Sequence, residues 1–117
     1  MLPAINPTTT PTWHQLEQHA AAMKTVHMKE LFAADPNRFK HFSTCCRDIV
    51  FDYSKNIITT ETIELLVQLA AACGVKEAIV SMFAGESINE TENRAVLHTA
   101  LRNFSGQPVL SSGIDVM

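Results

Sequence analysis

The chain has little glycine, few cysteines and no long apolar run, and each shortage excludes a class of protein. Its 117 residues include only four glycines, none of them in the glycine-rich turn that holds phosphate groups at a helix start. No apolar run approaches the ~18 residues of a membrane-spanning helix. The sequence also has no GxSxG elbow, P-loop or HExxH pair, so these sites for nucleophilic, nucleotide and zinc chemistry are excluded.

Excess positive charge is absent too. Nine Lys and Arg residues stand against twelve Asp and Glu residues, and the formal net charge is -3. This balance argues against a nucleic-acid partner, because phosphate binding depends on clustered Lys and Arg. The N-terminus lacks the basic and then apolar character of a secretory signal, so we expect a cytoplasmic protein.

The three cysteines make a poor disulfide framework. Cys45 and Cys46 are adjacent, and no CxxC pair is present to begin a zinc site. An odd number of cysteines fits a reducing compartment. We expect structural thiols that are buried or half-buried.

What is present is typical of a globular protein, with 46% hydrophobic and 18% charged residues. Residues 1–11 are polar and rich in proline and threonine, and we expect an extended arm. Thr12 then begins a capping box with Gln15, which predicts a first helix. A second helix is expected over residues 26–34, and Pro36 stops it.

The hydrophobic period changes after this helical region. Ile49, Phe51 and Tyr53 alternate in a β-branched and aromatic run, which places three large apolar side chains on one face of a strand. Residues 41–45 precede this run, and together the two segments predict a hairpin. His41 and Cys45 are two metal-ligand types in this region, but two such residues do not complete a tetrahedral site.

Two further helices are predicted after the hairpin. Thr59 or Thr60 caps the first, over residues 61–73, and Gly74 ends it. Its apolar stripe, expected to be buried, is Ile63, Leu66, Val67, Ala70 and Cys73. The second helix covers residues 75–84.

The C-terminal residues predict a strand that enters a tight turn. The chain turns at Ser105 and Gly106, and a strand at Val109 and Leu110 then leads into Ser112 and Gly113. We expect residues 114–117 to be too short for a stable partner strand.

Residues 83–102 contain the most informative pattern. Gly85 can end one helix in a left-handed conformation, and Thr91 can cap the next, with Glu92 at the positive end of its dipole. In such a helix Arg94, His98 and Arg102 recur every four residues as a basic stripe. The stripe could bind a phosphorylated ligand. We favour pairing of the arginines with carboxylates such as Glu86, Glu90 and Glu92, because the chain has no glycine-rich phosphate turn.

The string MFAGESINETENRAVLHTALRN, at residues 82–103, resembles the N-terminal motif of the phosphoglucose isomerase family. The words RFKHFS, DYSKN and PVLSSGIDVM follow the same family's order and approximate spacing. Departures from the family pattern are Ser87, where Lys is usual, Phe104, where Arg is usual, and the Cys45–Cys46 pair. The motif residues, to which we assign structural roles, are Gly85, Glu86, Asn89, Thr91, Glu92, Arg94, His98 and Arg102.

The resemblance implies an enzyme that interconverts D-glucose 6-phosphate and D-fructose 6-phosphate. In the mechanism that the resemblance implies, a histidine opens the sugar ring, and a glutamate base then moves a proton between C2 and C1 through a cis-enediol. No metal or organic cofactor is required, and the partners implied are the sugar phosphate and a second subunit in a homodimer. Family members are several times longer than this chain, and the resemblance places the catalytic residues downstream. We therefore assign no catalytic, cofactor-binding or metal-binding residue.

The fold class implied is α/β. Residues 12–117 would be a mainly helical N-terminal segment with short hairpins, part of a larger two-domain α/β/α sandwich. We expect this piece by itself to be inactive, and marginally stable or self-associating. Two alternatives remain: a short non-catalytic paralogue that docks on a full-length isomerase, and a small sugar-phosphate binding protein that uses Arg94, His98 and Arg102.

Overall fold

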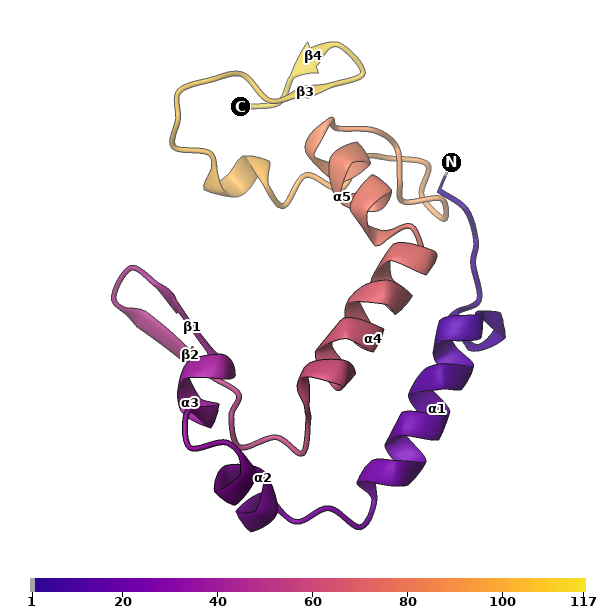
Figure 1. The fold of residues 1–117 in the computed structure, drawn as a ribbon. Helices are drawn as coiled ribbons and strands as arrows, with labels where there is room; N and C mark the ends of the chain where they lie inside the picture. The colour runs from indigo at the N-terminus through magenta and orange to yellow at the C-terminus, as the bar shows by residue number, and fades with distance from the viewer. Residues whose placement is uncertain (1) are drawn as a thin grey trace. The chain divides into compact units, whose positions relative to one another are not determined.

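The structure is a computed structural model that describes residues 2–117 (Figure 1). It divides into two compact units, which we describe separately. One unit comprises Thr8–Leu69, and the other comprises residues 2–7 with Ala70–Met117, so the boundary falls inside a helix. Helices alternate with two short antiparallel hairpins, and the expected mixture of helix and short hairpins is confirmed.

The N-terminal residues contain a short helical turn before the first long helix. The 3-10 turn η1 (Pro7–Thr9) lies within the arm that we expected to be extended, and helix α1 (Pro11–Met23) follows. Thr10 is the N-cap, because its hydroxyl oxygen accepts a hydrogen bond from the N–H of Trp13 at 3.2 Å. The expected capping box at Thr12 is wrong, since Pro11 already occupies the first helical position, where its fixed φ is favourable.

Two short helices connect α1 to the first hairpin. Helix α2 (Met28–Ala34) begins after His27, whose N–H donates to the carboxylate of Glu30 at 3.1 Å, and it ends before Pro36 as predicted. Helix α3 (Arg38–His41) is a single turn that the sequence pattern did not predict. The side chain of Arg38, on this helix, is buried in the interior of the unit.

Arg38 is the centre of the packed part of this unit, with only 2% of its surface exposed. Its guanidinium donates to three backbone carbonyls, those of Ser54 (2.8 Å), Asn56 (2.8 Å) and Ile58 (2.9 Å). The same guanidinium lies over the rings of Phe42, at 4.5 Å, and Phe32, at 5.6 Å. The buried charge is therefore satisfied by carbonyl dipoles and aromatic rings, and it fastens α3 to the chain that follows the hairpin.

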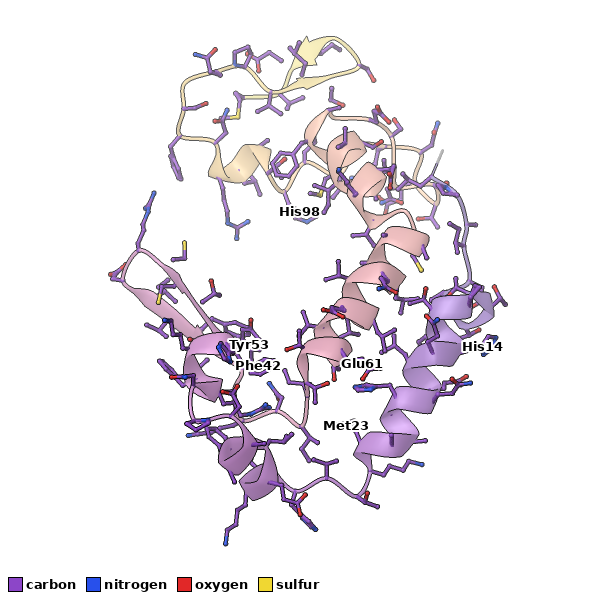
Figure 2. The ribbon with its side chains drawn as sticks, viewed as in Figure 1. His14, Met23, Phe42, Tyr53, Glu61 and His98 are labelled. Atoms are coloured by element: carbon purple, nitrogen blue, oxygen red, sulfur yellow. The ribbon has the colours of Figure 1, made fainter. Side chains whose placement is uncertain are left out.

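The first hairpin pairs β1 (Ser43–Cys46) with β2 (Ile49–Asp52), in the register Ser43 with Asp52 and Cys46 with Ile49. The predicted hairpin is thus confirmed. Tyr53 follows β2 and contacts Phe42 edge to face, with ring centroids 6.0 Å apart (Figure 2). Every residue of β2 is exposed, so the predicted apolar face is not covered.

The cysteines of this hairpin are exposed, which contradicts the expectation of buried or half-buried thiols at Cys45 and Cys46. A two-stranded hairpin has no second layer to cover either of its faces, and adjacent residues on a strand point to opposite faces. Cys73 is half-buried, as expected.

Helix α4 (Thr60–Ala72) and helix α5 (Val75–Phe83) confirm the two helices predicted after the hairpin. The predicted buried stripe of α4 is wrong at Leu66 and Val67, which are exposed, and Leu65 is buried instead. The other predicted members, Ile63, Ala70 and Cys73, are half-buried. Within the Thr8–Leu69 unit, the side of α4 that meets α1 is the side of Leu65, about 100° from Leu66. The pattern identified an apolar helix but not the neighbour against which it packs.

Gly85 ends α5 as predicted, with φ at 69°. Its N–H donates to the carbonyl of Met82 at 3.2 Å, and the next N–H, of Glu86, donates to Ser81 at 3.0 Å. This pair of bonds is a Schellman ending, which satisfies carbonyls at the end of the helix.

The C-terminal hairpin pairs β3 (Leu110–Ser111) with β4 (Ile114–Asp115). Ser112, with φ at 52°, and Gly113, with φ at 78°, form the tight turn between them. The turn was predicted, but the expectation that residues 114–117 provide no partner strand is wrong for this two-residue pair.

The helix predicted from Thr91 to Arg102 is absent, and the structure has only the 3-10 turn η2 (Ala100–Arg102) there. The side chain of Asn89 accepts from the Thr91 hydroxyl and from the N–H of Glu92, which gives the backbone an alternative to helix. Asn93 then takes a left-handed φ of 49°. These local bonds exclude a regular basic stripe over residues 94–102.

No single helix among residues 2–117 is long and apolar enough to cross a membrane; α4 and α5 reach the required length and composition only when counted together as a bent pair.

Candidate functional site

The family motif lines a hollow of about 520 Å³ in the unit that contains Ala70–Met117. The loop before η2, η2 itself and the C-terminal hairpin supply its wall. The lining residues are Asn89, Arg94, Ala95, Val96, Leu97, His98, Ala100, Leu101, Ser111 and Val116. The side of η2 that carries Ala100 is buried, and Ala100 is 6% exposed.

A short loop holds the polar edge of this cavity. The backbones of Asn89 and Arg94 pair as an isolated antiparallel bridge, with N–H to carbonyl distances of 3.1 and 3.3 Å. The Asn89 side chain accepts from the Thr91 hydroxyl at 2.8 Å and from the Glu92 N–H at 3.3 Å. The loop is therefore tied together by its own polar groups.

The positive charge of Arg94 is already paired within this loop. Its Nε contacts the carboxylate of Glu92, and both side chains are more than half exposed. The amide of Asn89 also donates to that carboxylate, at 3.3 Å. Pairing of an arginine with Glu92, the interpretation that we favoured, is confirmed for Arg94.

The structure brings together part of the expected motif set. Asn89, Arg94 and His98 line the cavity, whereas Arg102 does not. The remaining motif residues, all outside the lining, are Gly85, Glu86, Thr91 and Glu92. Ser111 joins the site from β3 and donates from its hydroxyl to the Gly85 carbonyl at 3.4 Å, a contact that the sequence pattern did not predict.

This arrangement suits recognition or packing better than acid–base chemistry. Proton transfer at a sugar carbon needs an acid and a base held apart across a closed site. The cavity lining instead has one histidine, an ion-paired arginine and mostly apolar side chains. The described residues of this unit do not assemble a proton-transfer pair at the cavity.

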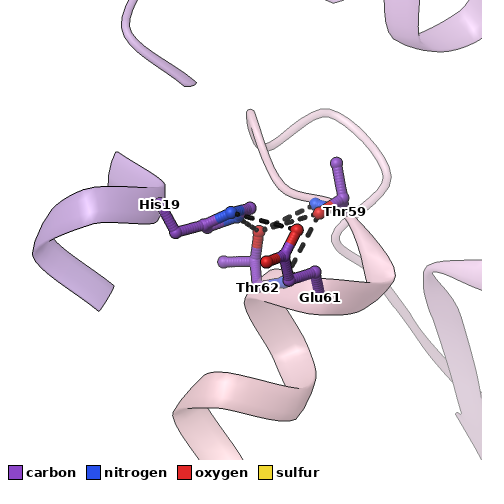
Figure 3. A network of polar contacts seen from close by, with 4 residues as sticks. All are labelled: His19, Thr59, Glu61 and Thr62. Atoms are coloured by element: carbon purple, nitrogen blue, oxygen red, sulfur yellow. Dashed lines mark hydrogen bonds and ion pairs between the residues drawn. The ribbon is translucent and has the colours of Figure 1, made fainter. Parts of the chain in front are cut away.

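A second polar cluster lies in the Thr8–Leu69 unit, where α1 meets the first turn of α4 (Figure 3). His19 Nε2 lies 2.6 Å from the hydroxyl oxygen of Thr62, and its Nδ1 lies 3.4 Å from Glu61 Oε2. The His19 side chain is 9% exposed. A pocket of about 380 Å³ adjoins it, lined by Gln15, Gln18, His19, Ala22, Glu61 and Leu65.

The order hydroxyl, imidazole and carboxylate is that of an activated nucleophile. The hydroxyl of Thr62 has a structural role, however, because it accepts the N–H of Thr59 at 2.9 Å, while Thr59 accepts the N–H of Thr62 at 3.4 Å. These two bonds form the N-terminal cap of α4. Thr62 lies outside the 380 Å³ pocket, but with His19 it lines a neighbouring hollow of about 320 Å³. We therefore interpret the cluster as a fastening between α1 and α4.

Two carboxyl groups in the same unit have lowered pKa values, each with a local cause. The hydrogen bond from His41, at 2.8 Å, is the largest influence that lowers the pKa of Asp35. Hydrogen bonds from Ser54 lower the pKa of Asp52, at the end of β2. His41 thus pairs with a carboxylate rather than with Cys45.

Arg38 is the important residue that sequence reasoning missed. It stands in the word RFKHFS, which we used only for the resemblance. A possible signal was the placement of one arginine among Phe32, Phe39 and Phe42, a setting that favours cation–π contact.

No group of three or more His, Cys, Asp or Glu residues is positioned to hold a metal ion within the described part of the chain. The fold and the site define a segment of helices and short hairpins. Its side chains mainly pack against one another, and a cavity lies beside the motif at residues 82–103. Comparison with known proteins then identifies the family.

The phosphoglucose isomerase family model matches residues 52–117, more than half of the chain. Three relatives named glucose-6-phosphate isomerase match nearly all of it. The protein of Wigglesworthia glossinidia brevipalpis is 54% identical over 114 residues, which are 97% of this chain and 21% of the relative. That of Desulforapulum autotrophicum is 51% identical over 117 residues, which are all of this chain and 21% of the relative.

The third relative, from Methylococcus capsulatus, is 51% identical over 110 residues, which are 94% of this chain and 20% of its own length. The chain belongs to the phosphoglucose isomerase family, as the motif words predicted. It spans about a fifth of the length of the curated relatives that it matches.

Proposed function

We propose that this chain is the N-terminal scaffold of an enzyme that interconverts D-glucose 6-phosphate and D-fructose 6-phosphate. The observation that carries the proposal is identity of 51–54% to glucose-6-phosphate isomerases over nearly the whole chain. In this proposal the scaffold supplies no catalytic side chain, and the acid, the base and the phosphate-binding groups belong to the other four fifths of the enzyme.

The cavity beside the motif supports the scaffold role. Arg94 is paired with Glu92, and the motif loop is closed by bonds from Asn89. Side chains that are already paired in this way hold a loop in shape, and using them for substrate would require breaking those bonds. The motif residues therefore act as structural elements that shape the surface around η2.

The wider architecture follows as part of the same proposal. The described residues before α1 form an N-terminal arm that contains η1, and residues 12–117 form the N-terminal segment of the larger domain in a two-domain α/β/α sandwich. The complete enzyme is a cytoplasmic homodimer that uses no cofactor. Its partner is the sugar phosphate substrate, and it binds neither nucleic acid nor a membrane. Near balance between basic and acidic residues supports the absence of a nucleic-acid partner.

A chimera tests the proposal. This chain replaces the aligned 114 residues of the Wigglesworthia isomerase, and conversion of fructose 6-phosphate to glucose 6-phosphate is measured with a coupled dehydrogenase. We expect the folded chimera to retain kcat within about tenfold of the relative, because the catalytic groups are unchanged and a tenfold loss would require a rise of about 1.4 kcal/mol in the activation free energy. This chain by itself should have no activity above buffer. A folded chimera without activity contradicts the proposal.

Sugar-phosphate binding by the short chain itself is less well supported. That alternative needs Arg94, His98 and Arg102 together, but Arg94 is ion-paired and Arg102 lies outside the cavity lining. If it held, the Arg94→Ala variant of this chain would lose a saturable, salt-sensitive binding of glucose 6-phosphate. We expect no such binding in either form by calorimetry.

A further inference from the structure

Large apolar side chains of the Thr8–Leu69 unit are exposed on several of its elements, including α4 and β2. On α4, Leu66 is 48% exposed and Val67 is 63% exposed. On β2, Ile49 is 68% exposed and Phe51 is 63% exposed. We call these four residues the open face, and each would lose its remaining contact with water if another protein segment covered it.

The open face on α4 is distinct from the side that already has a neighbour. Leu65 is buried and shares its pocket with residues of α1, including His19. Successive residues of an α-helix are separated by about 100°, so Val67 lies about 200° around the axis from Leu65. The α4 helix is therefore apolar on two opposite sides, and α1 occupies one of them.

The open-face residues on β2 belong to a hairpin in which only two strands pair. The pairing of β1 with β2 makes a sheet of two strands, and all four residues of β2 are exposed. An isolated two-stranded hairpin is marginally stable in water, and its outer edges offer unpaired N–H and C=O groups. Apolar residues on such a hairpin are typical of an element that a larger body covers.

We propose that the open face, Ile49, Phe51, Leu66 and Val67, is a docking surface that binds the remaining four fifths of an isomerase even when the two are separate polypeptides. The inference rests on the proposed function and adds the surface and its partner to it. The partner has a defined chemistry: the segment of a glucose-6-phosphate isomerase that has no counterpart in this chain.

The length of that segment favours it over a second copy of this chain. The aligned 114 residues are 21% of the Wigglesworthia relative, so about four fifths of that protein lies outside this chain. A body of that size can cover both a hairpin and a helix side, whereas a second copy presents the same uncovered elements. Interfaces of permanently associated proteins have apolar cores like a domain cut in two.

Co-expression tests the docking. Tagged chain is produced together with the Wigglesworthia isomerase from which the aligned 114 residues have been removed, and the tag is used for purification. We expect a soluble one-to-one complex by native mass spectrometry, with isomerase activity. Absence of a soluble complex overturns the inference, and so does a tagged chain that purifies only with copies of itself.

A matched pair of variants tests the surface. Val67→Asp places a charge on the open face, whereas Gln68→Asp places the same charge on the next residue, which is also exposed but polar. We expect Val67→Asp to weaken the complex at least about tenfold by titration, and Gln68→Asp to change it less than about twofold. Phe51→Asp should match Val67→Asp. Circular dichroism of each free variant establishes that α4 is retained.

Equal binding by Val67→Asp and Gln68→Asp would overturn the assignment of the open face. The chimera separates this outcome from failure of the proposed function, because it joins the same two parts covalently. An active chimera with no complex between separate parts rejects the docking inference alone. An inactive, folded chimera rejects the proposed function.

Discussion

Replacing Arg38 with methionine should destabilise the Thr8–Leu69 unit more than any exposed substitution. The change keeps an unbranched side chain in the space between Phe42 and Phe32 but removes the guanidinium. Three carbonyls then lose their donor, at Ser54, Asn56 and Ile58. The bond to Ser54 is buried, and the other two are partly buried.

The expected cost follows from these contacts. An orphaned buried carbonyl at Ser54 costs about 1–3 kcal/mol, and the two carbonyls that water can reach cost about 0.5–1 kcal/mol each. Loss of the cation–π contact with Phe42 adds about 1 kcal/mol. Relief of the desolvation of the guanidinium offsets part of this sum. We therefore expect a net loss of about 2–3 kcal/mol in the free energy of unfolding.

Urea titration followed by circular dichroism measures the loss. With a slope of about 1–1.5 kcal/mol per molar urea, the midpoint of Arg38→Met should fall by about 2 M. Arg38→Lys should lose about half as much, because an ammonium cannot reach three carbonyls with the planar fork of a guanidinium. Lys40→Met is the matched control, since Lys40 lies on the same helix and is exposed. Equal midpoints for Arg38→Met and Lys40→Met would refute this reasoning.

Three further outcomes are expected. Thr62→Val should lower the free energy of unfolding by about 1 kcal/mol in a urea titration, because it breaks the cap of α4; an unchanged midpoint contradicts that role. Gly85→Ala should cost about 2 kcal/mol or more in the same assay, since φ is positive and a Cβ would collide with the carbonyl of Leu110; a neutral effect would disprove the close approach. The pKa of Asp52 is lowered by Ser54, so its contribution to stability is present above pH 3.8 and is lost as the pH falls through the folded value. Asp52→Asn should therefore show a shallower fall of the urea midpoint below that pH, and parallel curves would exclude the bond.

Local signals in the sequence predicted several elements correctly. Gly85 ends α5 with a positive φ, and Thr59 caps α4, because each effect depends on residues within one helical turn. The first hairpin was predicted from the alternation of Ile49 and Phe51, and the family from the motif words at residues 82–103. Such features need no knowledge of distant parts of the chain.

Features that depend on a competing local bond or on a distant partner were not predicted. The stretch after Thr91 has a helical period, but Asn89 bonds to the backbone at Glu92 and Asn93 turns left-handed. Leu65 is buried rather than Leu66 because of where α1 packs, and the hydrophobic pattern of α4 carries no information about the position of α1.

The same reason explains why Arg38 was missed. Its three carbonyl partners lie 16 to 20 residues away along the chain, and no spacing rule connects an arginine with backbone carbonyls. The hydrogen bond between His19 and Thr62, which are 43 residues apart, could not be predicted from the sequence for the same reason.

The most direct test of the central claim is the mass and activity of the native polypeptide that contains this sequence. An antibody against residues 61–73 captures it from its source, and the intact mass and the interconversion of the two hexose phosphates are measured on the captured material. The scaffold account predicts a polypeptide about five times heavier than 12.9 kDa that interconverts the two sugars. A captured polypeptide of 12.9 kDa, or a longer one without isomerase activity, would contradict it.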